Sequence, residues 1–373
     1  MRIICEKNEL LASVQTISPA VQYKGTLPIL SNFLIETAKN KIKISSTDLE
    51  ISVKCYMKGE VVEEGGITVH ARRFTDIVKE FVNNEIEIRS DETNCINIKS
   101  GKSKFILAGI SKTEYPPMPK LSVDDEVFLL RKDIFVSMLK KTIFAVSRDS
   151  QKYVLNGICF ILDSDFRMIA TDGKRLAYAA TKEIKTNKKR KEAIVPTKAA
   201  DSILKILSHD SKSEYIKIAV TDNQLVIEVS DVIFFSTLIE GTFPNYEQVI
   251  PKKNDFEVKL NVKNTFTAVK QVAILTADKI LADKSTAIRL CFGSNVLRIS
   301  ASTTGLGSGE VELEIDYKGK STEISFNPNF LKEALQNINE DFIVFKFNDY
   351  LNPAIMYPEI DRNYFYVIMP MRI

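Results

Sequence analysis

Hydrophobic and polar positions along the chain form a series of patterns that occurs three times. Each copy opens with apolar residues three or four positions apart, the period of an amphipathic helix, and these helices are predicted over residues 7–18, 131–147 and 261–275. Alternating strand patterns follow, then a second helix and further strands. The pattern therefore predicts three tandem repeats of similar construction.

A strand that turns directly into the second helix marks each repeat. These segments occupy residues 67–81, 193–207 and 324–335. Pro196 and Pro328 are predicted to begin their helices, because the first helical residue needs no N–H donor. Each repeat closes with an apolar strand, and the prolines that follow these strands are predicted to be equivalent: Pro116, Pro244 and Pro370.

A Thr-Asp pair sets the offset between repeats. Thr47-Asp48 and Thr171-Asp172 each follow two apolar strands, and they lie about 124 positions apart, a third of the 373 residues. The third copy, within residues 287–309, is weaker. Runs of strands with two helices in each repeat predict an α+β fold. We expect three homologous domains, each with two helices packed on antiparallel sheets, over residues 1–122, 128–251 and 252–373.

The same residues bear on possible chemistry. Asp48 and Asp172 could form a catalytic carboxylate pair, but their equivalent places in two repeats favour a shared structural turn. A glycine cluster at 304–309 could cradle a phosphate, but it lacks the lysine and the helix pattern of such loops, which favours a connection between strands. An enzyme that processes nucleotides with these groups is the alternative interpretation.

Composition limits the class of protein. Hydrophobic residues make up 45% of the chain and charged residues 27%, which excludes collagen-like and mostly disordered chains. No apolar run reaches the ~18–20 residues of a membrane helix, and Glu6 and Glu9 interrupt the segment where a signal peptide would be apolar. The five cysteines are odd in number and widely spaced, as expected for reduced thiols of a cytoplasmic protein. Neither a metal site nor a cofactor is predicted.

The net charge is only +3, but basic residues are placed regularly on the predicted helices. For one helix, a solvated face would account for them. Equivalent helices in repeated units instead favour a polyanionic partner, held through its phosphates. The residues concerned lie opposite the apolar face or recur at a seven-residue spacing: Arg72 and Lys79, Lys198 and Lys205, Lys141 and Arg148, Lys263 and Lys270, and Lys332.

Six segments, ordered along the whole chain, are modest singly and specific together. They are TLPILSNFLIE (26–36), STDLEISV (46–53), LNGICF (155–160), ATDGKRLA (170–177), GTFPNYEQVIP (241–251) and VIMPMRI (367–373). In these segments the chain resembles the bacterial DNA polymerase III beta subunits, the sliding clamps. The resemblance implies a head-to-tail homodimeric ring of six domains, with helices that line a central hole around double-stranded DNA. It also implies a non-catalytic replicative processivity factor.

The resemblance further implies a set of partners. They are the DNA polymerase III catalytic subunit, the clamp loader, and other replication and repair proteins that carry a short apolar clamp-binding peptide; no membrane partner is implied. The peptide groove would lie between the second and third domains. Its positions match Leu155, Thr171, Gly173, Lys174, Arg175, Leu176, Pro244, Val249, Met369, Pro370, Met371 and Arg372. Without the resemblance, a closing strand packed in its own core would be the better interpretation of the C-terminal residues.

Two further surfaces follow from the resemblance. The subunit contact would join the first domain to the third domain of a second copy through Ile77, Phe81, Phe105, Ile274 and Leu275, which could instead be core residues. The DNA-facing surface would add Lys24, Arg73, Gln151, Lys152 and Tyr153 to Arg148 and the helix residues above. A monomeric peptide-binding scaffold with no DNA role is the second alternative.

Overall fold

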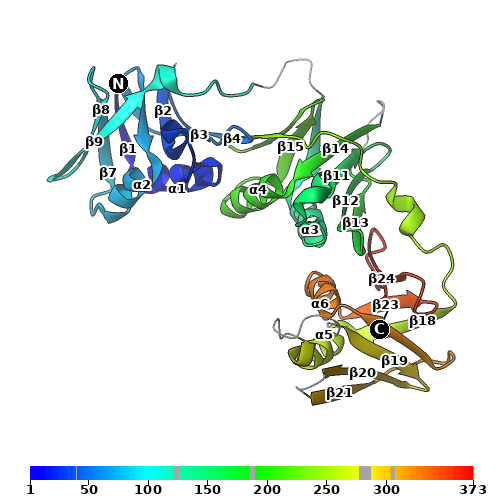
Figure 1. The fold of residues 1–373 in the computed structure, drawn as a ribbon. Coiled ribbons are helices and arrows are strands. Elements are labelled where there is room, and N and C mark those ends of the chain that lie inside the picture. Colours follow the sequence, from blue (N-terminus) through cyan, green and yellow to red (C-terminus); the bar gives the residue numbers. More distant parts are fainter. Residues whose placement is uncertain (39, 121–125, 185–189, 277–286, 304–306, 373) are drawn as a thin grey trace. The chain divides into compact units, whose positions relative to one another are not determined.

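The computed structural model describes residues 1–38, 40–120, 126–184, 190–276, 287–303 and 307–372. The chain forms two compact units, one of Met1–Val136 with Lys198–Ile239 and one of Ser137–Thr197 with Glu240–Ile373. The second repeat is thus divided, since its parts pack with the first repeat in one unit and with the third repeat in the other. Figure 1 shows the strands and helices of each.

The first unit is built on one antiparallel sheet, which has 13 strands in the described part of the chain. Its strand order is β10-β15-β16-β17-β4-β3-β2-β6-β9-β8-β7-β1-β5. The strands are β1 (Arg2–Glu6), β2 (Asn32–Ala38), β3 (Lys41–Thr47), β4 (Ile51–Met57), β5 (Glu60–Glu63), β6 (Gly66–His70), β7 (Glu85–Ser90), β8 (Cys95–Ser100), β9 (Ser103–Ser111), β10 (Val127–Arg131), β15 (Tyr215–Val220), β16 (Gln224–Val229) and β17 (Val232–Thr237).

Helices α1 (Lys7–Ile17), α2 (Ala71–Glu80) and nearly all of α4 (Thr197–His209) belong to this unit. α1 and α2 contact each other, and α1 packs on β3 and β4 (Figure 1). Apolar residues at helical spacing, such as Phe74 and Val78, are fully buried, as the pattern predicted. His70 caps α2, because its Nδ1 accepts a hydrogen bond from Arg73 N at 3.5 Å.

The second unit has two antiparallel sheets within the described residues. One has the order β14-β11-β12-β13-β25-β24-β23-β18 and the other β21-β20-β19-β22. The strands are β11 (Gly157–Leu162), β12 (Phe166–Thr171), β13 (Arg175–Thr181), β14 (Lys191–Pro196), β18 (Phe256–Asn261), β19 (Ile288–Gly293), β20 (Val296–Thr303), β21 (Gly307–Glu314), β22 (Thr322–Phe326), β23 (Phe342–Phe347), β24 (Ala354–Pro358) and β25 (Tyr364–Ile368). Helices α5 (Val262–Val272) and α6 (Pro328–Gln336) contact each other (Figure 1).

Most predicted helices are present, with corrections at their ends. α3 (Lys132–Ile143), which the two units share, stops four residues before the predicted end at 147. α5 gives way to a 3₁₀ turn, Ala273–Thr276. Pro328 begins α6 as predicted, but Pro196 is the last residue of β14 and pairs with Gly157, so α4 begins at Thr197. The α+β class with antiparallel sheets is confirmed.

Sheet pairing joins successive repeats in the same way twice. β17 of the second repeat pairs with β4 of the first, and β25 of the third repeat pairs with β13 of the second. At the same place in each join, Thr237 N donates to Glu50 O and Met369 N donates to Lys174 O, both at 2.9 Å. Met369 is therefore equivalent to Thr237, and the prediction that Pro370 corresponds to Pro244 is wrong.

Two expectations from composition can be compared with the structure. Among the described residues, no helix combines the length and apolar character required to cross a membrane. The five cysteines are free thiols, of which Cys5, Cys55 and Cys159 are buried. Burial raises the pKa of Cys5 to about 12 and that of Cys55 to about 11, so these thiols stay protonated and unreactive near neutral pH.

Candidate binding surfaces

The two Thr-Asp pairs form one kind of turn, as predicted. Asp48 Oδ1 accepts hydrogen bonds from the backbone N–H groups of Glu50 and Ile51, at 3.0 and 2.8 Å. Asp172 Oδ1 accepts from the N–H groups two and three positions later, at 2.8 and 3.1 Å. Each carboxylate therefore closes its own tight turn. This structural use of both side chains disfavours the interpretation of them as a catalytic pair.

Within the described residues, no group of three or more His, Cys, Asp or Glu side chains could hold a metal ion. The other feature of the enzyme alternative is the glycine cluster. The predicted glycine cluster falls partly on residues 304–306, which lie outside the described residues; Gly307–Gly309 begin β21. The first described residues after the cluster thus continue as a strand, which agrees with the predicted connection between strands.

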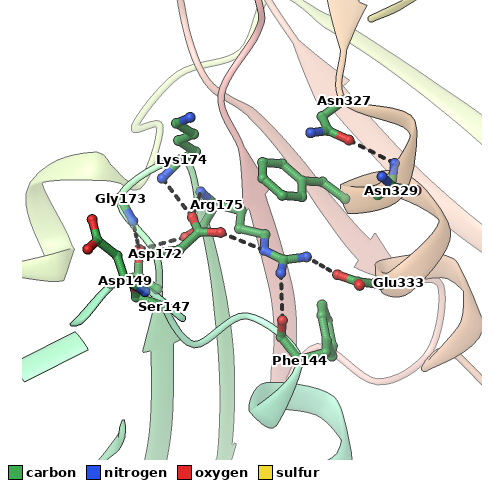
Figure 2. A network of polar contacts seen from close by, with 12 residues as sticks. Phe144, Ser147, Asp149, Asp172, Gly173, Lys174, Arg175, Asn327, Asn329 and Glu333 are labelled. Atoms are coloured by element: carbon green, nitrogen blue, oxygen red, sulfur yellow. Dashed lines mark hydrogen bonds and ion pairs between the residues drawn. The ribbon is translucent and has the colours of Figure 1, made fainter. Parts of the chain in front are cut away.

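Arg175, predicted in the peptide groove, is the centre of a buried polar network (Figure 2). Its side chain is only 7% exposed. Its guanidinium donates from Nε to Asp172 Oδ2 at 3.0 Å, from one terminal nitrogen to Phe144 O at 2.6 Å, and from the other to the Glu333 carboxylate. The guanidinium also lies 4.3 Å from the centre of the Phe330 ring, a cation–π contact. All three guanidinium nitrogens are therefore engaged inside the protein.

Burial alone would lower the pKa of Arg175, but Tyr366 and Glu333 beside it raise that pKa. The guanidinium thus keeps its charge in a desolvated place. This arrangement gives the residue a structural role, because its side chain is buried and each guanidinium nitrogen already has a partner inside the protein. Its position instead ties the Thr171–Arg175 turn to α6, whose Glu333 and Phe330 the sequence did not single out. Glu333 lies 158 positions from Arg175, so no local spacing could have paired them.

The other predicted groove residues differ in accessibility. The exposed members could contact a ligand directly, whereas the buried members can only shape the surface. Exposed members are Gly173, Lys174, Pro244, Val249, Met369 and Arg372. Half-buried members are Thr171, Pro370 and Met371, and the buried members besides Arg175 are Leu155 and Leu176.

The C-terminal segment is fixed next to this turn. Met369 N donates to Lys174 O at 2.9 Å, and Met371 N donates to Ser325 O at 2.7 Å, where Ser325 lies in β22 just before α6. Gly173 has a φ of 87°, which glycine adopts without strain. The turn, the C-terminal segment and α6 are thus held together in one compact unit, and Met369 remains 37% exposed beside them.

The predicted DNA-facing residues are mostly exposed. Arg72, Arg73 and Lys79 are exposed on α2, and Lys263 and Lys270 are exposed on α5, seven residues apart as predicted. The remaining exposed members are Lys24, Arg148, Gln151, Lys152, Tyr153 and Lys205, and Lys332 is half-buried. Exposed cations on helices can reach phosphates.

Lys198 and Lys141 form close ion pairs with carboxylates of the protein, whereas Arg72 lies 4.0 Å from Asp76 and Lys152 donates to Asp172 O at 3.4 Å. Lys198 Nζ lies 2.7 Å from Asp48 Oδ2 and 2.9 Å from Glu50 Oε2. Burial would lower the pKa of Lys198, but its hydrogen bonds to the two carboxylates outweigh burial and raise that pKa. Lys141 is paired with Asp361 at 2.7 Å, with its side chain only 17% exposed. The charges of these two residues are thus compensated within the protein, more completely for Lys141 than for Lys198, whose side chain is 52% exposed.

The predicted shared face of Lys141 and Arg148 is also wrong. α3 ends at Ile143, so Arg148 lies beyond the helix and a seven-residue spacing repeats no face there. Arg148 is exposed in the segment that leads to a 3₁₀ turn, Ser150–Leu155.

The predicted interface residues occur in two groups. Phe81 is 4% exposed and packs edge-on against Phe105, which is 41% exposed, with their ring centres 5.7 Å apart. Ile77 is half-buried on α2. In the third repeat, Ile274 is 73% exposed and Leu275 is half-buried beside β21. Phe105 and Ile274 thus leave apolar surface uncovered, whereas Phe81 belongs mainly to the core.

Known protein families match the three repeats separately. Residues 1–119 match the N-terminal domain of the DNA polymerase III beta subunit, residues 129–245 its central domain, and residues 247–372 its C-terminal domain. The chain belongs to the DNA polymerase III beta subunit family. This membership confirms the predicted family, the three tandem α+β clamp domains and the function of a replicative sliding clamp.

Individual beta subunits match over their full length. The beta sliding clamp of Chlamydia pneumoniae is 30% identical over all of this chain and 99% of its own, and that of Vibrio cholerae is 27% identical over all of both. The solved sliding clamp of Bacillus subtilis is 26% identical and superposes with a TM-score of 0.93 over all of this chain and 99% of its own. The Pseudomonas aeruginosa clamp bound to griselimycin is 28% identical, with a TM-score of 0.93 over all of both chains.

Proposed function

We propose that two copies of this chain form a ring that encircles double-stranded DNA and tethers a DNA polymerase, with no catalytic activity of its own. The ring would contain six domains, three from each copy, over residues 1–122, 128–251 and 252–373. The observation that carries the proposal is the sheet pairing between successive repeats. The same pairing joins the first repeat to the second and the second to the third. One strand edge of the first repeat and one of the third repeat remain that could form the same pairing with another copy.

The first free edge belongs to β9. This strand is the counterpart of β17, because each follows its neighbouring strand through a two-residue turn, Gly101–Lys102 for β9 and Ser230–Asp231 for β17. β17 uses its other edge to pair with β4. Among the described strands, β6 pairs only with Gly109–Ser111 of β9, so the outer edge of Ser103–Ala108 has no strand beside it.

The second free edge belongs to β21. This strand is the counterpart of β4 and β13. In the first two repeats, β4 and β13 follow the Thr-Asp turn and pair with the strand before it, and β21 pairs with β20 in the same way. Within the described chain, β21 pairs with β20 alone and ends its sheet. An exposed strand edge is a template for pairing with another chain. Pairing of β9 with β21 of a second copy would repeat the two existing joins and close a head-to-tail dimer.

Exposed side chains next to the two edges suit this contact. Phe105 on β9 and Ile274 next to β21 are apolar and accessible, and Leu275 lies at the same end of the third repeat. Phe81 packs against Phe105 on the side of the core, and Ile77 of α2 would add apolar surface to the same contact. Burial of such apolar surface is the main source of free energy in stable dimers.

The proposed DNA-facing surface consists of the exposed cations described above, without Lys141 and Lys198. Phosphate contacts through lysine and arginine carry no base specificity, as sliding requires. A closed ring also needs no tight binding, because it cannot leave a long duplex without opening. Loading would therefore depend on a clamp loader.

The proposed peptide site lies next to the C-terminal segment, with Gly173, Lys174, Val249 and Met369 accessible. Methionine adapts to varied apolar partners, which suits a site for the polymerase catalytic subunit, the clamp loader and other replication and repair proteins. The free, buried cysteines agree with a cytoplasmic protein.

Retention on DNA of defined topology tests the ring. We expect the loaded protein to stay on nicked circular DNA through gel filtration and to be lost when a restriction enzyme linearises the circle. Equal loss from circular and linear DNA would contradict a closed ring, and a monomeric mass by light scattering would favour the scaffold alternative.

A further inference from the structure

We propose that Glu333 is a positioning residue for peptide binding, which acts through Arg175 and does not contact the peptide. The inference rests on the proposed peptide site and concerns how that site is held in shape. Glu333 lies in α6 of the third repeat, whereas the turn that it reaches through Arg175 lies in the second repeat (Figure 2).

The partners of Arg175 divide between the two repeats. Asp172 Oδ2 and Phe144 O come from the second repeat, so they hold the guanidinium within its own domain. Glu333 and the ring of Phe330 come from α6. Since Glu333 supplies the only carboxylate from the third repeat among these contacts, it provides the charged connection between the turn and α6.

The same two elements fix the C-terminal segment. Lys174 O, next to Arg175, accepts from Met369 N, and Ser325 O, just before α6, accepts from Met371 N. The distance between these two carbonyls sets the path of Met369–Met371. A shift of α6 relative to the turn would therefore change the surface that carries Met369, even though each domain kept its fold.

Loss of Glu333 has a consequence that distinguishes this role from direct binding. Without it, Arg175 keeps Asp172 and Phe144 O, so the charge stays hydrogen-bonded within the second repeat. If Arg175 bound the peptide directly, the freed nitrogen would leave affinity unchanged or increase it. If Glu333 positions the site, affinity falls because part of the binding energy must restore the geometry.

Griselimycin, a peptide-like ligand that the Pseudomonas aeruginosa and Bartonella birtlesii clamps bind, is the probe. Its affinity for the full-length chain, Glu333→Ala and Glu333→Gln is measured by isothermal titration calorimetry, with thermal unfolding in parallel. Glu257→Ala is the matched control, because it removes a glutamate ion pair at 2.8 Å from Lys346 in the same compact unit, away from the turn. A chain that ends at Ile368 tests whether griselimycin uses the C-terminal segment.

We expect Glu333→Ala to weaken griselimycin about three- to tenfold, Glu333→Gln to weaken it less, and Glu257→Ala to have no effect beyond about twofold. Unchanged or tighter binding by Glu333→Ala, or an equal loss in Glu257→Ala, would overturn the inference while the peptide site stands. Binding that survives deletion of residues 369–373 would overturn the proposed peptide site and this inference with it.

Discussion

Lys198 Nζ lies 2.7 Å from Asp48 Oδ2, so the second helix of one repeat is bonded to the Thr-Asp turn of the repeat before it. The next junction has the same plan, because Glu333 of α6 is bonded through Arg175 to the turn of Asp172. Each turn therefore closes its own domain and also forms an ion pair with the second helix of the next domain.

Replacement of Asp48 should lower stability. In Asp48→Ala the turn loses its acceptor for two backbone N–H groups and Lys198 loses a partner, and we expect the free energy of unfolding to fall by about 1–3 kcal/mol. Asp48→Asn keeps the Oδ1 acceptor and should lose less. Urea denaturation measures both. Asp76→Ala, on the exposed face of α2, is the control, and equal stability of all variants would contradict the turn role.

Dimerisation should depend on Ile274. Its side chain is 73% exposed in the single chain, so Ile274→Asp should leave the fold intact and place an unpaired charge in the proposed interface. We expect a monomeric mass by multi-angle light scattering at micromolar concentration. Ile360→Asp changes another exposed isoleucine, 82% exposed, and should remain a dimer. Two dimeric variants would exclude Ile274 from the interface.

The basic residues of α5 should contribute to DNA affinity through counterion release. We expect the double variant Lys263→Gln, Lys270→Gln to bind a short linear duplex more weakly. The slope of log K against log salt should become about 2 units less steep, since each phosphate contact contributes about 0.9. Fluorescence anisotropy over a salt series measures this slope. Lys141→Gln should leave the slope unchanged because Lys141 is paired with Asp361.

Lys54 has an environment that makes stability depend on pH. It lies in β4, donates to Pro119 O, and has its Nζ 4.7 Å from the centre of the Phe235 ring. Burial, with the charges of Lys43 and Lys120, lowers the pKa of Lys54 from 10.5 to about 8. Between about pH 8 and pH 10.5 the folded protein therefore lacks a proton that the unfolded chain binds.

Because the unfolded state binds more protons in that window, the contribution of Lys54 to stability should rise with pH. We expect the stability of the wild type relative to Lys54→Met to be constant below pH 7 and to increase from about pH 8, by up to about 1.4 kcal/mol per pH unit. Urea denaturation at a series of pH values measures the difference, in which the other titrating groups common to both proteins cancel. A pH-independent difference would contradict the lowered pKa.

Periodicity and repetition predicted much of the fold, because they record which faces are buried. The six amphipathic helices and the shared turns of Asp48 and Asp172 follow from such local patterns. Helix ends were less predictable. α3 stops at Ile143 although the apolar pattern continues, and Pro196 pairs in β14 although proline favours a helix start. At such positions, contacts formed in the folded protein outweigh the local sequence preference and set where a helix begins or ends.

Contacts between residues far apart in the sequence explain which site roles could not be predicted. Seven-residue spacing placed Lys141 among the DNA-facing cations, but Asp361, 220 positions away, compensates its charge. Family resemblance placed Arg175 in the groove, but its role depends on Glu333, which only the fold brings near. Where two residues lie on one face of a single helix, as Lys263 and Lys270 do, the spacing alone was sufficient to place them.

The two junctions have opposite polarity, and this has a consequence for assembly of the chain. At the first junction the turn is acidic and Lys198 on the helix is basic, whereas at the second the turn carries Arg175 and the helix carries Glu333. Three similar repeats can dock in the wrong order during folding. With the two helices exchanged, α6 would leave Asp48 without Lys198, and α4 would leave Arg175 without Glu333. Each junction therefore keeps its ion pair only with its own helix, which favours the native order of the repeats over an exchanged one.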